Sequence, residues 1–590
     1  MKIVTNVLKT VWQYLEGLNG IVFALYALLV FGTAAFTQDY YADKGMAMPF
    51  LAIFGIALLA CPAILRIFQV LEFKKRELKY TKLPYVKLIL KLAIISLFYI
   101  IPYLYLNLFY TAYAPGGFSP DSFKQYTQVL TGEYNDWHPV LHSLLAFKLP
   151  LDLTGGDFTF IAKFQVIWFS IAIGYALSAV YKYTRLRYAV IGLVFLIINP
   201  RFGYIALFVW KDMAFAICAL FLITFALHIY MSKGAWLKSY VNMAALIVIS
   251  VVATFVRHNG LLFTIPLLAA TFFFINFKKT LVIALSFIIL CLGIKFPLYS
   301  ALKVEAPDQR VVESMGLPLT VIAGVVVNDF ESLDEETEEF VRAVAPIKVW
   351  EDNYKNLNGK KYADREGTFN YIKWNENTNI QVIEDTGRAK IISMMFSCFK
   401  NSPKESYIAL IKLTNHAYTL TDSYNEHLET DMFVKFTNTY GIEKTGDVEL
   451  QSTLKTHYKF MEERFGFLFL YLGLLHLILV VSILAKCKLT KFKDLKTVFF
   501  ILPVLIYNFG STLLLTGYDD AHRFFFYTYL LMPVLLVFLY KKNDDVTDTD
   551  TLGCILFKAV KPFFKKKAVE KVSEEVAAEE PVLEEATVEA

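Results

Sequence analysis

Long apolar runs recur from Gly20 to Tyr540, and they constrain the fold of this chain more than any other feature. Hydrophobic residues make up 56% of the 590 residues, and charged residues only 19%. A soluble domain has no use for so much apolar surface, whereas a helix of roughly 20 apolar residues crosses the hydrocarbon core of a bilayer. We therefore predict an all-α polytopic membrane protein.

The lengths of the apolar runs predict about twelve transmembrane helices. The expected spans are approximately 20–36, 49–70, 86–109, 158–181, 188–203, 211–230, 239–256, 261–276, 280–297, 466–485, 497–516 and 524–540. The fifth and sixth are the least regular, because Asn199-Pro200-Arg201 lies between them.

Lys and Arg residues predict the orientation of these spans, because cytoplasmic loops carry an excess of both. Basic residues gather in loops 71–85, 182–187, 231–238 and 486–496, all of which fall on one side. That side is therefore expected to be the cytoplasm, and both termini are expected to face it.

The spans and loops divide the chain into six expected parts. The large loop at 298–465 is roughly 165 residues long, which is a common size for a domain, and we expect it to be mainly helical and to lie over the outer face. The parts are three N-terminal spans (1–109), a first large outer loop (110–157), a membrane core (158–297), an extracytoplasmic insertion (298–465), C-terminal helices (466–540), and a basic then acidic disordered tail (541–590).

Strongly ionisable residues gather on the other, outer side of the membrane. Charge near a bilayer is costly, so such residues are candidates for function. Their convergence on one face predicts a polar site at the outer end of a helical bundle, built from Asp121, Asp136, His138, Asp212, Arg257, Asp519, Asp520 and Arg523.

Three candidates lie in the first outer loop. Asp121 could serve as a general base or a metal ligand, although Ser119 or Asp121 could equally cap a short helix. Asp136 and His138 flank Trp137 and could bind a hydroxyl-rich substrate or a phosphate. The alternative for this segment is a helix start with an interfacial tryptophan.

Asp212 and Arg257 lie at the ends of later spans. A carboxylate such as Asp212 before a long apolar run is costly unless it is paired or faces water. Its neighbour Lys211 is expected on a different helix face. Arg257 could clamp a phosphate in a bidentate manner, with His258 beside it, or its side chain could extend to the outer interface.

The last cluster precedes the final span. Arg523 could bind a second phosphate oxygen or pair with an acidic residue. Asp519-Asp520 is similar to a metal-binding pair, but adjacent carboxylates are common in short loops. A divalent metal ion is therefore an open alternative, with Asp121, Asp519 and Asp520 as its candidate ligands.

Four motifs, taken in order, resemble the C superfamily of multi-pass membrane glycosyltransferases (GT-C). The resemblance covers most of residues 86–540 and is closest to a bacterial membrane family of that superfamily. Its motifs are Asp121 in the first large outer loop together with NDWHPVLHSLL, WKDMAF around Asp212, VRHNGLL around Arg257, and HRFFFYTYLLMP around Arg523.

This resemblance implies a GT-C-like core and an inverting transferase in a bacterial cell membrane, with its active site outside the cytoplasm. Asp121 would be the catalytic carboxylate, and a polyprenyl-phosphate sugar would be the donor. Arg257, His258 and Arg523 would contact the carrier phosphate. The residues expected to bind the acceptor or donor hydroxyls are Asp136, His138 and Asp212.

The expected partners are the lipid-linked donor, a cell-envelope glycan, polymer or lipid acceptor, and membrane lipids, with no nucleic acid. Two departures from the superfamily pattern stand out. The large outer loop follows the third span, which implies an added pair of N-terminal helices, and the insertion at 298–465 has no counterpart. A lipid-linked glycan polymerase or ligase, and a lipid or polysaccharide exporter, are the alternative functions. Charges at one face, not at mid-bilayer, disfavour the exporter.

Overall fold

The computed structural model describes residues 85–307, 310–355, 369–414, 440–469, 475, 479, 498–515 and 521–540. Within this part of the chain the regular structure is helical throughout, apart from two isolated β-bridges. The expected spans 20–36 and 49–70, most of 466–485, and the tail at 541–590 lie outside the described residues.

Four of the described helical stretches are long and apolar enough to cross a membrane. They are Ile89–Tyr113 of α4 (Tyr85–Tyr113), α8 (Phe160–Tyr183), α11 (Lys211–Met231), and Phe277–Ala301, which comprises α14 (Phe277–Gly293), the π-helical turn η5 (Ile294–Leu298) and α15 (Tyr299–Ala301). The all-helical fold is thus confirmed, whereas the count of twelve spans stays a prediction.

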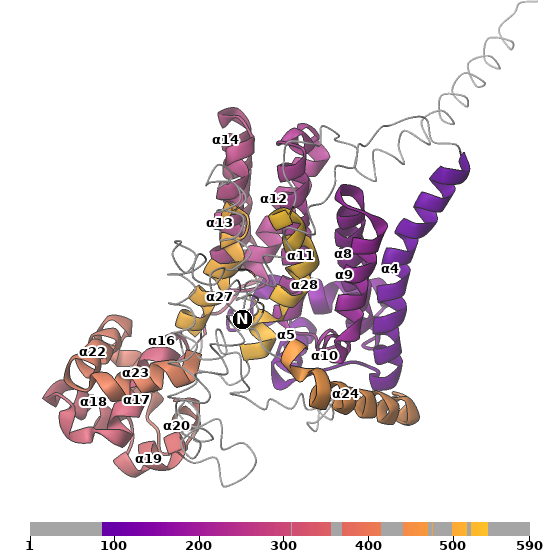
Figure 1. Cartoon of the computed structure of the whole chain (residues 1–590). Coiled ribbons are helices and arrows are strands. Elements are labelled where there is room, and N and C mark those ends of the chain that lie inside the picture. The colour runs from indigo at the N-terminus through magenta and orange to yellow at the C-terminus, as the bar shows by residue number, and fades with distance from the viewer. Residues whose placement is uncertain are drawn as a thin grey trace, which may run out of the picture.

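Shorter apolar helices occupy most of the other expected spans that the structure describes. They pack beside the long helices in one bundle (Figure 1). These helices are α9 (Leu186–Ile198), α12 (Tyr240–Phe255), α13 (Leu261–Thr271) with η4 (Phe272–Phe274), α27 (Leu502–Leu515) and α28 (Ala521–Tyr540).

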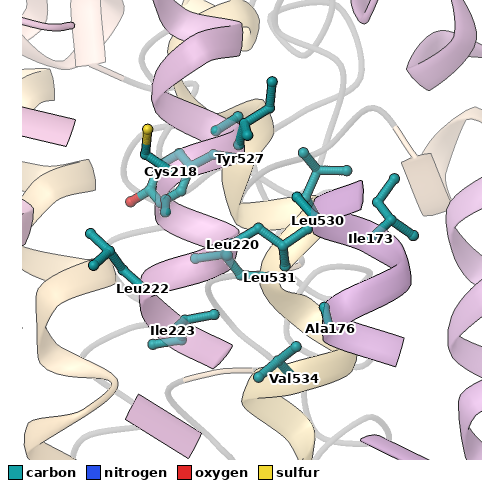
Figure 2. Close-up of a cluster of buried hydrophobic side chains, with 14 of the residues drawn as sticks. Ile173, Ala176, Cys218, Leu220, Leu222, Ile223, Tyr527, Leu530, Leu531 and Val534 are labelled. Carbon is teal, nitrogen blue, oxygen red and sulfur yellow. The ribbon is translucent and has the colours of Figure 1, made fainter. Parts of the chain in front are cut away.

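Helix α11 is the centre of the bundle core. Its sequence is apolar on every face, as is typical of a helix with protein on all sides. Figure 2 shows Leu220 of α11 beside Leu531 of α28, and Leu530 of α28 near Ile173 of α8, while Ile223 lies further along α11. All five side chains are buried, so α11 is held between α8 and α28.

The bundle also has an end at which the candidate residues lie, which we call the site end. Here α4, α12 and α14 end, while α8, α11, α13 and α28 begin. Helix α9 ends before Asn199, whose side chain accepts a hydrogen bond from the Arg201 amide. Short helices cover the site end, namely α5 (Pro120–Thr131), α6 (Val140–His142), η2 (Ser143–Lys148), α7 (Leu149–Thr154) and α10 (Pro200–Ile205).

Residues 310–355 and 369–414 form a helical unit with its own hydrophobic core, which lies beside α27 (Figure 1). The apolar stretch Met315–Val327 is not exposed to lipid here, because α17 (Gly316–Asn328) is the buried centre of this unit. Around it lie α16 (Arg310–Ser314), η6 (Phe330–Ser332), α18 (Glu335–Val344), α19 (Ile347–Lys355), α20 (Asn370–Lys373), α21 (Ile380–Thr386), α22 (Arg388–Asn401) and α23 (Pro403–Thr414).

Helix α24 (Val448–Phe469) contributes to a different core from that of helices α16 to α23. It lies across the bundle in Figure 1 and packs against α4 and α10. Its buried Leu454 and Tyr458, one turn apart, join the core of the bundle, and the Tyr458 ring contacts that of Tyr204. The stretch 298–465 therefore contributes to two separate cores.

Candidate functional site

Helix α5 brings Asp121 to the site end. Ser119 is the residue that caps this helix, because its hydroxyl accepts a hydrogen bond from the Ser122 amide. The same hydroxyl accepts a hydrogen bond from the indole of Trp210 at 2.9 Å, just before α11 begins. Asp121 is therefore not the cap, and its side chain stays 37% exposed in the first turn of α5.

His138 lies beside Asp121. Its Nε2 atom lies 3.9 Å from Oδ1 of Asp121, and its side chain is only 1% exposed. Neither ring nitrogen of His138 has a hydrogen-bond partner among the described residues. Burial, followed by the charge of Lys211, lowers the pKa of His138 to about 3, so the imidazole is neutral at pH 7.

Asp136 holds the loop that carries His138. Its two carboxylate oxygens accept hydrogen bonds from Lys295 Nζ and from the Tyr299 hydroxyl, each at 2.8 Å. Its backbone amide donates to Glu305 O at 2.9 Å, and the Glu305 amide donates back to Tyr134 O at 2.8 Å. Both carboxylate oxygens of Asp136 thus have protein partners, and a substrate hydroxyl would have to compete with them.

Asp212 and Arg257 form a buried ion pair at the junction of α11 with the α12–α13 turn. Nε of Arg257 also donates to the Asn259 side chain at 2.8 Å, and the guanidinium lies 5.8 Å from the centre of the Tyr507 ring. Asn259 in turn donates to Ser511. Asp212 is therefore paired, as its cost in an apolar setting requires. The alternative in which Arg257 extends to the outer interface is wrong, because its side chain is only 4% exposed.

His258 joins this turn to the loop of His138. Its Nε2 lies 3.3 Å from the carbonyl oxygen of Trp137. Burial, and then the charge of Lys211, lowers the pKa of His258. The structure therefore brings together Asp121, Asp136, His138, Asp212, Arg257 and His258, from three separate stretches of the chain.

Lys211 is the site residue that the sequence analysis missed. Because Lys211 is adjacent to Asp212 in sequence, we expected its side chain on a different helix face from Asp212. Its charge nevertheless lowers the pKa of His138, His142 and His258. The signal that could have identified it is its position as the first residue of α11, directly after Trp210. A lysine there adds positive charge that acts on two buried imidazoles, those of His138 and His142.

An apolar cavity of about 250 Å³ adjoins the site. His142, in the helical segment that follows His138, contributes to its wall, and Nδ1 of His142 is hydrogen-bonded to the Gln125 side chain. The other lining residues come mainly from η2, α8, α11 and α12, and include Leu145, Phe164, Trp168, Ile217, Phe221 and Val252. The segment 142–149, which follows His138 closely in the chain, therefore forms part of the wall of this apolar cavity.

The remaining candidates are placed only in part. Arg523 lies in the first turn of α28, and Asp519 and Asp520 lie outside the described residues. Within the described ranges no group of three or more His, Cys, Asp or Glu side chains could hold a metal ion. The metal alternative, which depends on Asp519 and Asp520, stays a prediction.

Comparisons with protein-family models, curated proteins and solved structures give no match to this chain.

Proposed function

We propose that this chain is a membrane glycosyltransferase with a GT-C-like core and about twelve spans. It would move a sugar from a polyprenyl-phosphate donor to a cell-envelope acceptor on the non-cytoplasmic face. The observation that carries the proposal is that His142, four residues after His138 and hydrogen-bonded to Gln125 in the helix of Asp121, lines an apolar cavity of about 250 Å³ in a helical bundle. A lipid-linked sugar needs both environments at once, because its carrier is hydrocarbon and its reacting end is polar.

The donor is proposed to place the first part of its lipid chain in the cavity between α8, α11 and α12. The cavity wall at Leu145, Phe164 and Ile217 is apolar and offers few hydrogen-bonding groups, which suits an isoprenoid. The carrier phosphate would then lie towards Arg257, His258 and Lys211. Asp212 holds the Arg257 guanidinium in place, and Lys211 adds positive charge beside the histidines.

The proposed reaction is a single displacement at the anomeric carbon. A bond forms between an acceptor oxygen and that carbon, while the bond from the carbon to the phosphate oxygen breaks. The phosphate leaves with the electron pair, and Asp121 takes the proton of the acceptor hydroxyl. Cations beside the departing phosphate stabilise the charge that grows on it.

Replacing Asp121 by Asn tests this proposal. We expect a deletion strain to lose one envelope sugar and to regain it with the wild-type gene. Asp121→Asn should lower the rate of transfer about 10²- to 10⁴-fold, because the amide cannot accept the proton. The measurement is the glycan composition of the envelope, with the amount of protein in the membrane measured in parallel.

Asp152→Asn is the matched control, because Asp152 is an exposed carboxylate of the same outer segment that pairs with Lys148. It should restore the sugar as the wild type does. If Asp121→Asn restores it equally well, Asp121 has no catalytic role. If deletion changes no envelope sugar, the chain is not this transferase.

A further inference from the structure

His138 differs from the other buried histidines of the bundle. His142 is hydrogen-bonded to Gln125, and His228 to the Tyr183 hydroxyl at 2.7 Å. His138 is buried just as deeply, yet both of its ring nitrogens lack a hydrogen-bond partner in the described part of the chain. Buried polar groups are nearly always hydrogen-bonded, so an imidazole without partners indicates a group that arrives from outside the fold.

The distance between the side chains of His138 and Asp121 indicates how large the arriving group can be. The distance of 3.9 Å between Nε2 and Oδ1 is too long for a direct hydrogen bond. A single oxygen atom, however, can lie about 2.8 Å from both atoms at once, which is the usual length of such bonds. Asp121 is partly exposed whereas Nε2 of His138 is buried, so the oxygen would approach from the side of Asp121.

We propose that one hydroxyl oxygen of the acceptor lies between Asp121 and His138, donating its hydrogen to Asp121 and accepting one from Nε2 of His138. This inference rests on the proposed function and specifies how the acceptor is held. A neutral imidazole carries one N–H donor, and a carboxylate only accepts, so the pair matches the one donor and the acceptor sites of a hydroxyl.

Charge around the pair favours a hydroxyl over other groups. An anion would meet the Asp121 carboxylate, and an ammonium group would meet the positive field of Lys211 and Lys124 that His138 experiences. When the acceptor oxygen bonds to the anomeric carbon, its proton passes to Asp121. His138 keeps its own proton and fixes the direction of the attacking lone pair.

The test compares His138→Phe, which keeps a ring but removes both nitrogens, with His138→Gln, which keeps an N–H donor. We expect His138→Phe to lower envelope glycosylation about 100-fold, the typical effect of losing one positioned donor. Its melting temperature should equal or exceed that of the wild type, because an unpaired buried polar group is removed. His138→Gln should recover activity to within about tenfold of the wild type, since its amide is a comparable donor.

His457→Gln, a change at an exposed position of α24, is the control and should behave as the wild type. Full activity in His138→Phe would overturn the inference. So would an equal loss of activity and of melting temperature in both His138 variants, because His138 would then support only the fold. If the wild-type gene itself restores no sugar, the proposed function has failed, and the melting temperatures still decide whether His138 lacks a partner in the folded chain.

A metal ion is the competing occupant of the same position. We expect that Mg²⁺, Mn²⁺ and Zn²⁺ do not raise the melting temperature of the purified full-length protein through this position. A metal ion held there would raise the melting temperature of the wild type but not that of Asp121→Asn or His138→Gln. Such a rise would replace the hydroxyl by a metal ion and overturn the proposal.

Discussion

The ion pair of Asp212 with Arg257 is the most consequential contact between single residues. Both side chains are almost fully buried, so the attraction between the two charges, together with hydrogen bonds such as that from Arg257 to Asn259, offsets the cost of desolvating each of them. Removing one partner leaves the other as an uncompensated buried charge. Removing both takes away the attraction and the desolvation cost together.

We therefore expect Asp212→Leu and Arg257→Met each to destabilise the protein by about 3–5 kcal/mol, and the double variant to cost less than either. The measurement is a double-mutant cycle on the free energy of unfolding in detergent. The exposed pair Lys148–Asp152 is the control, for which an i,i+4 coupling of about 0.3–0.5 kcal/mol is expected. Additive effects at Asp212 and Arg257 would show that the pair does not form.

The histidines of the site predict how stability depends on pH. Burial, and then Lys211, lowers the pKa of His138 and of His142 to about 3, against about 6.5 when unfolded. Between these values the unfolded chain binds the proton and the folded chain does not, so stability falls as the pH drops below about 6.5. In that range each histidine should lower the free energy of unfolding by about 1.4 kcal/mol for every pH unit by which the pH falls.

Unfolding at pH 7.5 and pH 5.5 measures this effect. His138→Gln should remove the part of the pH-dependent loss of stability that His138 causes. His142→Gln should likewise remove the part that His142 causes. A loss of stability that is unchanged in both variants would assign the pH dependence to other groups.

At the scale of elements, close approach between α4 and α8 depends on Gly174. A Cβ atom at this position would lie 2.3 Å from the Tyr99 ring, which is a clash. Small residues allow helices in membranes to pack closely. The α4–α8 contact therefore requires a residue without a side chain at position 174. The neighbouring Gly203 receives the Phe109 ring of α4 in the same way.

Gly174→Val should therefore destabilise the bundle by about 1–3 kcal/mol, and adding Tyr99→Ala should recover part of the loss. Gly293→Val is the control, because no atom lies within 4 Å of a Cβ built at that helical position. The measurement is the melting temperature of the purified protein. An equal loss for Gly293→Val would assign the effect to helix propensity and not to packing.

At the scale of the whole molecule, the sequence predicted elements better than it predicted contacts. The apolar runs at 86–109, 158–181 and 211–230 correspond to α4, α8 and α11, because a helix forms locally from its own residues. The convergence of acids and bases was also expected from their positions at span ends. The roles assigned to those residues stay predictions until activity is measured.

Contacts between distant segments could not be predicted from local patterns. The sequence indicated that Asp212 needed a partner but not that Arg257, which is 45 positions later, would supply it. Likewise, nothing in residues 440–469 shows that Tyr440 would contact Tyr126, or that α24 would join the bundle core. Such pairings depend on how the finished helices pack.

The hydrogen bonds of Asp136 have a consequence for the order in which the protein becomes functional. A ribosome makes the loop of residues 134–139 long before it makes Lys295, Tyr299 and Glu305, which hold that loop in place. A nascent chain that stops before α14 therefore has Asp121 and His138 but lacks the contacts that fix one against the other. Truncated products of interrupted translation would therefore reach the membrane with this loop not yet anchored.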